Sequence, residues 1–123
     1  MGELDVIIEG ENGEFLTFYE GMNLEYLNKS TITSHIEKII NKYDALGIPE
    51  KFLGSYCKTS DFDGLSSKYF EFLNRFDYNS INFSDVIDVT TDFSVHTEIR
   101  IFKSTYDKSG RKILLTHILI HLS

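Results

Sequence analysis

The chain has 123 residues, of which 19 are acidic and 12 are basic, and its formal net charge is therefore −7. This length predicts a single domain over residues 1–123, and the acidity disfavours direct binding to nucleic acid. No apolar run approaches the ~20 residues of a membrane span, and no basic leader precedes such a run, so we expect a cytoplasmic protein that binds no membrane. A single cysteine excludes an internal disulfide.

The acidic residues are concentrated in two segments that contain no base. Residues 1–28 carry seven acids and residues 76–99 carry five, whereas residues 100–123 carry a surplus of four bases. A solvated acidic surface is one explanation of this layout. The other is a negative surface that attracts a basic protein partner.

The beginning of the chain predicts a β-hairpin over residues 4–20. Asn12 and Gly13 tolerate the positive φ angles of a two-residue type I′ turn, and a turn there pairs Val6 with Tyr19. The face of this hairpin that we expect to enter the core carries Leu4, Val6, Ile8, Phe15 and Tyr19.

Two amphipathic helices are predicted in the middle of the chain. The first begins at Ser30 or Thr31 and continues to about Leu46, because its apolar residues recur at steps of three and four. Gly47 then supplies a left-handed cap. The second helix runs over residues 65–76, capped by Asp63 or Ser66.

The last third of the chain predicts strands at residues 85–91, 93–106 and 111–122, whereas residues 50–63 are expected to be irregular. A type I turn over 107–110 would place Asp107 opposite Arg111. The face of this second hairpin that we expect to be buried holds Phe93, Val95, Ile99, Ile101, Ile113, Leu115, His117 and Leu119. The predicted fold is thus α+β, an antiparallel sheet of about five strands with two helices packed on one face.

No motif predicts an enzyme, a metal or a cofactor. His117 and His121 share a strand face, but four residues of extended chain separate them by about 13 Å, too far for one zinc ion. His117 is therefore expected to be a hydrogen-bonded core residue and His121 to fray at the C-terminus. Cys57 is expected to be a small buried hydrophobe, and residues 61–64 match a helix N-terminus better than a calcium loop.

Aromatic residues are abundant, with ten phenylalanines, seven tyrosines and no tryptophan. Phe70 and Tyr78 lie outside the helical stripes. Such residues beside acids are typical of protein-binding surfaces. The alternative is a second small core, in which residues 50–64 and 77–84 pack over the second helix.

Three classes of function fit this pattern. The first is an inhibitor that neutralises a basic protein, such as a nuclease toxin or another nucleic-acid-binding effector. Immunity proteins and phage inhibitors of host defence complexes are both of this kind. The second is a ligand-binding or acid–base enzyme domain with a pocket between helices and sheet near His117. The third is a self-assembling subunit, for which a homodimer is expected.

The inhibitor hypothesis is preferred, because a basic partner and an acidic domain attract each other at long range. The residues expected to bind the partner are acids of the two base-free segments together with two of the aromatic residues. They are Glu9, Glu11, Glu14, Asp85, Asp88, Asp92, Phe70 and Tyr78.

Overall fold

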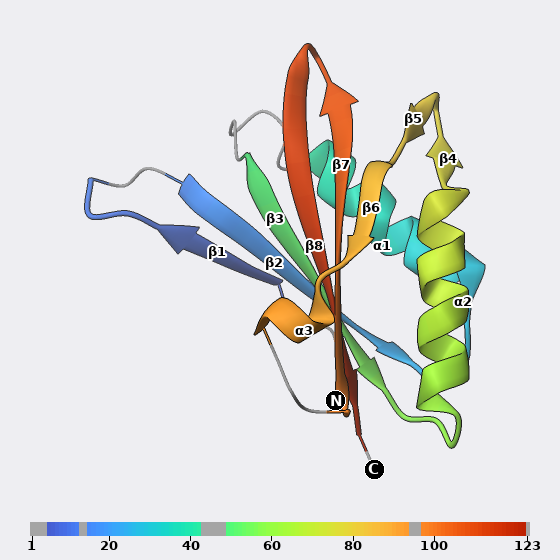
Figure 1. Ribbon diagram of the computed structural model, residues 1–123. Coiled ribbons are helices and arrows are strands. Elements are labelled where there is room, and N and C mark those ends of the chain that lie inside the picture. Colours follow the sequence, from blue (N-terminus) through green and yellow to red (C-terminus); the bar gives the residue numbers. More distant parts are fainter. Residues whose placement is uncertain (1–4, 13–14, 43–48, 94–96, 123) are drawn as a thin grey trace.

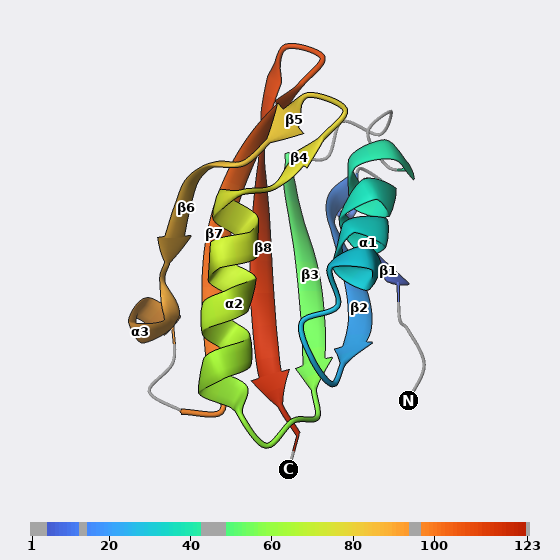
Figure 2. The same cartoon turned by 90° about the vertical axis from the view of Figure 1, so that its right-hand side faces the viewer.

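Six strands form one twisted sheet, and two long helices lie together over one of its faces (Figures 1 and 2). The computed structural model describes residues 5–12, 15–42, 49–93 and 97–122. The strands of this sheet are β1 (Asp5–Glu9), β2 (Phe15–Leu24), β3 (Glu50–Cys57), β6 (Ser84–Asp88), β7 (Ile99–Lys108) and β8 (Arg111–His121). The helices are α1 (Lys29–Lys42), α2 (Phe62–Asn74) and the single turn α3 (Thr90–Phe93). A separate two-stranded sheet comprises β4 (Asp77–Tyr78) and β5 (Ile81–Asn82).

The predicted α+β class is confirmed, but the prediction of an antiparallel sheet is wrong. The strand order is β1-β2-β3-β8-β7-β6, and β3 runs parallel to both of its neighbours. The chain leaves β2, passes through α1 and returns as β3, and such a helical crossover brings the next strand back in the same direction. The sheet is therefore mixed, with its two parallel pairs at the centre.

The segment predicted to be irregular contains β3, which is a central strand. Every second residue of β3 faces the helices, and these residues are Lys51, Leu53, Ser55 and Cys57, all with no exposed surface. Two of the four inward residues are polar, and this conceals the alternation that a half-buried strand normally displays in its sequence. Cys57 is buried, as predicted.

The two long helices begin at side-chain caps. The backbone N–H of Thr31 donates to the side chain of Asn28 at the start of α1, and that of Gly64 donates to Asp61 at the start of α2. Both helices therefore begin a little earlier than predicted. The predicted cap at Gly47 lies outside the described residues.

The N-terminal hairpin has the predicted register up to Ile8, where a shift pairs Glu9 with Phe15, but it buries the other face. Val6 pairs with Tyr19, as predicted. The side chains directed at the helices are those of Phe18, Glu20 and Met22, all fully buried, whereas Val6 is 37% exposed. The prediction failed because it assigned Glu20 to solvent, and the helix α1 provides partners for this buried carboxylate. Gly13 and Glu14 lie outside the described residues.

The C-terminal hairpin differs from the prediction by one residue. Ser109 and Gly110 both have positive φ angles, 54° and 77°, and form a two-residue turn that pairs Asp107 with Lys112. Because side chains alternate across a sheet, this shift turns Phe102, rather than Ile101, towards the helices beside His117. The predicted buried face of β8 is correct, whereas the predicted buried face of β7 is wrong. Phe93 is also not in a strand, since it ends α3, and Val95 lies outside the described residues.

Candidate protein-binding surface

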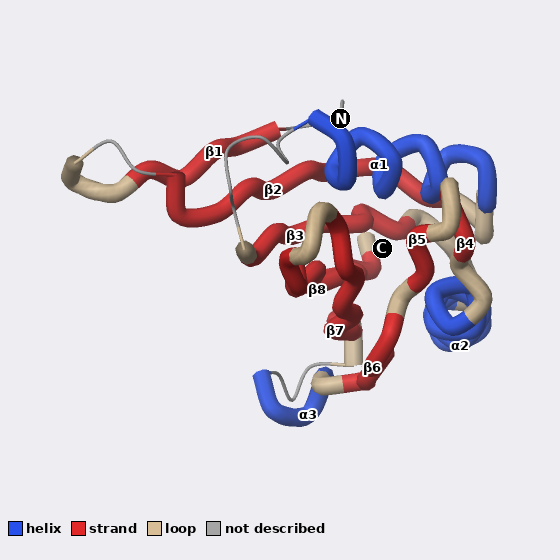
Figure 3. Tube along the Cα trace, turned by 90° about the horizontal axis from the view of Figure 1, so that it is seen from above, coloured by secondary structure: helices blue, strands red, loops and turns tan. Residues whose placement is uncertain are grey.

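The acids predicted to bind a partner lie at opposite edges of the sheet. Glu9 and Glu11 belong to the β1–β2 hairpin at one edge, and the exposed Asp85, Asp88 and Asp92 belong to β6 and α3 at the other. The turn end of the hairpin and α3 both project to the side of the sheet away from α2 (Figures 1 and 3). The two acidic groups therefore flank the sheet face that α1 and α2 do not cover.

This helix-free face is largely apolar. Along β3, β7 and β8 its side chains are half-buried, whereas those on the opposite face are almost all fully buried. Apolar and aromatic members of the helix-free face are Tyr19, Phe52, Tyr56, Ile99, Ile101, Leu114, Ile118 and Ile120. Lys103 also lies on it, and Thr116 contributes a buried hydroxyl without a hydrogen-bond partner in the described structure. The strand register places these half-buried side chains next to one another, and a partly accessible apolar face with a polar rim is a candidate binding surface.

Two tyrosines are held rigidly at the centre of the helix-free face. The hydroxyls of Tyr19 and Tyr56 are 2.5 Å apart and share a hydrogen bond across β2 and β3. Tyr19 reaches its partner by lying over Gly54, where a Cβ atom would come within 1.9 Å of the Tyr19 hydroxyl oxygen. Burial and the neighbouring phenol both raise the pKa of Tyr19, so this side chain is neutral at physiological pH.

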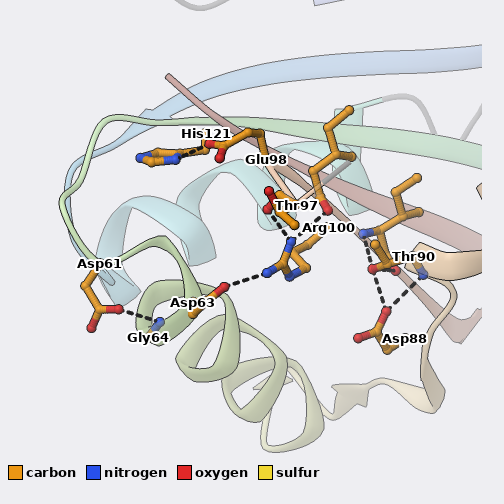
Figure 4. Close-up of polar contacts among 11 residues, drawn as sticks. Asp61, Asp63, Gly64, Asp88, Thr90, Thr97, Glu98, Arg100 and His121 are labelled. Carbon is orange, nitrogen blue, oxygen red and sulfur yellow. Dashed lines mark hydrogen bonds and ion pairs between the residues drawn. The ribbon is translucent and has the colours of Figure 1, made fainter. Parts of the chain in front are cut away.

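Asp88 has a structural role as well as a charge. Its carboxylate accepts hydrogen bonds from the backbone N–H and the hydroxyl of Thr90, at 2.9 and 2.6 Å, and so caps α3 (Figure 4). Asp85 lies at the irregularity in β6 with a φ angle of 51°, an uncommon conformation outside glycine. The backbone conformation at Asp85 and the cap of α3 at Asp88 therefore set where these two carboxylates lie at this edge of the sheet.

Phe70 and Tyr78 lie on the helix side of the sheet, apart from these acids. Phe70 packs edge-to-face on Phe102, with ring centroids 5.1 Å apart, and the Tyr78 hydroxyl accepts a hydrogen bond from Asn41. Phe76 stacks on Phe83 at 4.7 Å beside them. Of the predicted small core over the second helix, these contacts show only the packing of Phe83, from residues 77–84, on Phe76, whereas residues 50–57 form the central strand β3.

A set of contacts that the sequence did not predict ties α2 to the ends of β7 and β8. Arg100 donates to Asp63 at 2.5 Å, and the His121 imidazole bonds the Glu98 carboxylate (Figure 4). The other ring nitrogen of His121 bonds the Thr59 carbonyl. The ring of Phe62 stacks on the His121 ring, and the Arg100 guanidinium lies 5.2 Å from the centroid of the Phe62 ring. We call this group of residues, which comprises Thr59, Phe62, Asp63, Glu98, Arg100 and His121, the His121 clasp.

The partners of His121 in the clasp favour its protonated form. Both of its ring nitrogens face acceptors, so each must carry a proton to donate. The hydrogen bond to the Thr59 carbonyl and the adjacent Glu98 carboxylate raise the pKa of His121. The expectation that His121 frays is wrong, because residues far apart in sequence supply its partners.

His117 is buried, as predicted, in a chain of hydrogen bonds. Ser104 donates its proton to the Leu115 carbonyl, so His117 Nε2–H must donate to Ser104 Oγ, and Nδ1 accepts from the Tyr69 hydroxyl, both at 2.9 Å. Burial lowers the pKa of His117 to about 3, and the ring stays neutral. Since the histidine donates to the serine, this pair is not arranged to activate a serine nucleophile.

A second buried polar group joins β2 to α1. The Glu20 carboxylate accepts from His35 Nδ1 at 2.8 Å and lies 3.1 Å from the Lys38 ammonium. Its Oε2 is buried without a hydrogen-bond partner in the described structure. Glu20 is therefore part of the interior and does not contribute to the acidic surface.

Comparison with known proteins gives no family for this chain. No protein-family model matches it, and neither the curated proteins nor the solved structures contain a match. Among the described residues there is no group of three or more histidine, cysteine or acidic side chains able to hold a metal ion. None of the described helices is long and apolar enough to cross a membrane.

Proposed function

We propose that this chain is a protein-binding inhibitor that docks on a basic, nucleic-acid-acting partner through the helix-free face of its sheet. The observation that carries the proposal is the composition of that face. It combines half-buried isoleucine, leucine and aromatic side chains at the centre with carboxylates on either side. An apolar centre with a polar rim is the usual anatomy of a protein–protein interface.

The centre of this face is suited to binding without a large entropic cost. Tyr19 and Tyr56 are already fixed by their mutual hydrogen bond and by the close approach of Tyr19 to Gly54. Ordering a free side chain at an interface costs about 0.5–1.5 kcal/mol, and a preorganised pair avoids part of that cost. Tyrosine is also enriched among the residues that dominate binding energy.

The rim favours a basic partner. Glu9 and Glu11 lie on one side of the face and Asp85, Asp88 and Asp92 on the other, within a chain of net charge −7. Proteins that act on nucleic acids carry basic surfaces, so an acidic face that covers such a surface both accelerates association and blocks the nucleic-acid site. A bacterial immunity protein and a phage inhibitor of a defence complex are both consistent with this mechanism.

The interior favours this proposal over an enzyme with its site at His117. That side chain has no exposed surface, and its two nitrogens already bond Ser104 and Tyr69. A substrate could reach it only if α2 moved away from the sheet. The third hypothesis, self-assembly, would use the same helix-free face and is separated from the first by experiment.

The proposal is tested by capture followed by kinetics. The tagged chain is expressed in its own cells, the captured protein is identified by mass spectrometry, and that protein is produced in a pure form. We expect it to be basic and to lose nucleic-acid binding in the complex. We also expect the association rate constant to fall steeply as ionic strength rises. A rate constant that is independent of salt contradicts electrostatic docking, and a symmetric dimer without any captured protein supports self-assembly instead.

A further inference from the structure

The groove between α1 and α2 is a second feature of the surface, on the opposite side of the sheet from the proposed docking face. The two helices run side by side over the sheet (Figure 2), and between them lies a groove of about 490 Å³. Ligand sites commonly have volumes of about 300–1,000 Å³. The groove is therefore large enough to hold part of another molecule.

One stripe from each helix forms the walls. Lys29 and Thr33 are one turn apart on α1, and Lys68, Phe72 and Arg75 follow one another at steps of four and three on α2. Residues at these steps share a helix face. Thus α1 directs one basic residue, and α2 two basic residues and an aromatic one, into the same space.

The floor of the groove is apolar. Phe72 and Phe76 meet edge-to-face at 5.9 Å, and the half-buried Leu27 lies beside them. Phe72 is itself only half-buried, so part of its ring is accessible from the groove. An apolar side chain inserted here would cover exposed aromatic surface, at about 25 cal/mol per Å² removed from water.

The charge of the groove opposes that of the chain. Its lining carries three bases against two acids, Glu71 and Asp77, although acids outnumber bases 19 to 12 in the sequence. Glu71 already pairs with Arg75 at 3.1 Å. The ammonium groups of Lys29 and Lys68 have no ion-pair partner among the described residues, and both side chains are exposed.

The spacing of these charges favours an extended ligand. Lys68 and Arg75 are seven residues apart on α2, which is about 10 Å at 1.5 Å per residue. Lys29 faces them from α1. A peptide with acidic side chains at intervals can approach all three cations at once, whereas a single compact anion is smaller than this span.

We propose that the groove between α1 and α2 binds an acidic peptide segment of another protein, which pairs its carboxylates with Lys29 and Lys68 and inserts an apolar side chain against Phe72. This site is separate from the helix-free face, so the domain can hold a basic partner on one side and an acidic segment on the other. The two proposals are independent, and either can fail alone.

The test uses a fluorescein-labelled synthetic peptide in which glutamates alternate with leucine and phenylalanine. Binding to the full chain is followed by fluorescence anisotropy, and the site by amide shifts in ¹⁵N-labelled protein. We expect shifts concentrated at Lys29, Thr33, Lys68, Phe72 and Arg75. The double variant Lys29→Glu/Lys68→Glu should weaken binding by roughly tenfold or more.

Three controls make the result decisive. The variant Lys112→Glu makes the same change of charge at one exposed residue of β8 outside the groove. It should leave the affinity for the peptide within about twofold of the wild-type value. A peptide with alanine in place of leucine and phenylalanine should bind less tightly. Equal losses in the groove and Lys112 variants, shifts centred elsewhere, or no shifts at millimolar peptide overturn the proposal. Inorganic phosphate alone giving the same shifts assigns the groove to small anions and also overturns it.

Discussion

The imidazole of His121 lies flat on the ring of Phe62, with centroids 4.9 Å apart and planes inclined by 5°. The two residues come from the last strand and from the first turn of α2, so their contact fixes the start of that helix to the end of the sheet. A protonated imidazole on a phenyl face also gains cation–π attraction. The stability of the clasp therefore depends on the charge of His121.

Raising the pH through the pKa of His121 should weaken the clasp. The pKa of His121 in the folded chain is raised above its unfolded value of about 6.5, so the stabilisation is fully present below pH 6.5 and is lost as the pH rises through the folded value. NMR titration of the His121 ring protons should give a midpoint above 6.5. Glu98→Gln should lower that midpoint, and a midpoint unchanged in this variant would show that Glu98 does not hold the proton.

Lowering the pH should destabilise the chain through His117. This residue is neutral when folded, with a pKa of about 3, but is protonated below about pH 6.5 when unfolded, so the unfolded state binds more protons as the pH falls. The free energy of unfolding should drop by about 2 kcal/mol from this residue between pH 7 and pH 5.

The variant His117→Leu separates this contribution from the others. It should cost roughly 2–4 kcal/mol at pH 7, because the hydroxyl of Tyr69 and the oxygen of Ser104 each lose a partner. The variant should also lose the acid-dependent fall that His117 causes. Urea unfolding at a series of pH values measures both effects. If the free energy of unfolding depends on pH in the same way in the variant and in the wild type, His117 is not a buried neutral histidine.

Removal of the Glu20 carboxylate should be far more costly than removal of a surface carboxylate. Glu20→Ala removes the buried carboxylate that contacts both the buried His35 and the partly exposed Lys38, and we expect a loss of about 3 kcal/mol. Glu71→Ala is the matched control, since its pair with Arg75 is exposed on α2 and should be worth about 0.3–0.5 kcal/mol. Comparable losses in the two variants would contradict the buried pair.

A methyl group at Gly54 should disrupt the tyrosine pair. Gly54→Ala would place its Cβ 1.9 Å from the Tyr19 hydroxyl oxygen, so the ring must move and the bond to Tyr56 must break. We expect a loss of about 1–3 kcal/mol in the free energy of unfolding. Adding Tyr19→Leu should recover part of it. A Gly54→Ala variant as stable as the wild type would mean that Tyr19 does not lie over this strand.

Neutralisation of the rim should slow association with the captured partner. Asp88→Asn/Asp92→Asn removes two charges while asparagine keeps a capping oxygen for α3, so we expect a severalfold lower association rate at low salt and a stable fold. Asp107→Asn, at the β7–β8 turn, is the control for a charge away from the rim. If Asp107→Asn slows association equally, the association rate depends on the net charge of the chain and not on the position of the rim acids.

The sequence predicted those elements whose inward residues are mostly apolar. The stripe of α1 is correct because Ile32, Ile36, Ile39 and Ile40 are all fully buried. The strand β3 was missed because the polar residues Lys51 and Ser55 face inward. The wrong face of β2 was predicted to be buried because Glu20, which is fully buried, was expected to face solvent. Distant elements supply the partners of Lys51 and Glu20, and nothing local in the sequence indicates them.

The candidate surface was predicted in its charges but not in its arrangement. Asp88 and Glu9 lie in the two acidic segments that the sequence reveals, but their position on either side of one sheet face depends on the strand order. The one-residue difference at the β7–β8 turn also decides that Ile101 belongs to the helix-free face. Turn geometry, rather than composition, thus determines which apolar residues remain available to a partner.

Site-specific photo-crosslinking tests the proposed docking face most directly. A photo-reactive amino acid replaces Ile118 on the helix-free face in one variant and the exposed Ser67 on α2 in another, and both are irradiated with the purified partner. We expect an efficient crosslink from position 118 and little from position 67. Efficient crosslinking from position 67 with none from position 118 would rule out docking through the helix-free face.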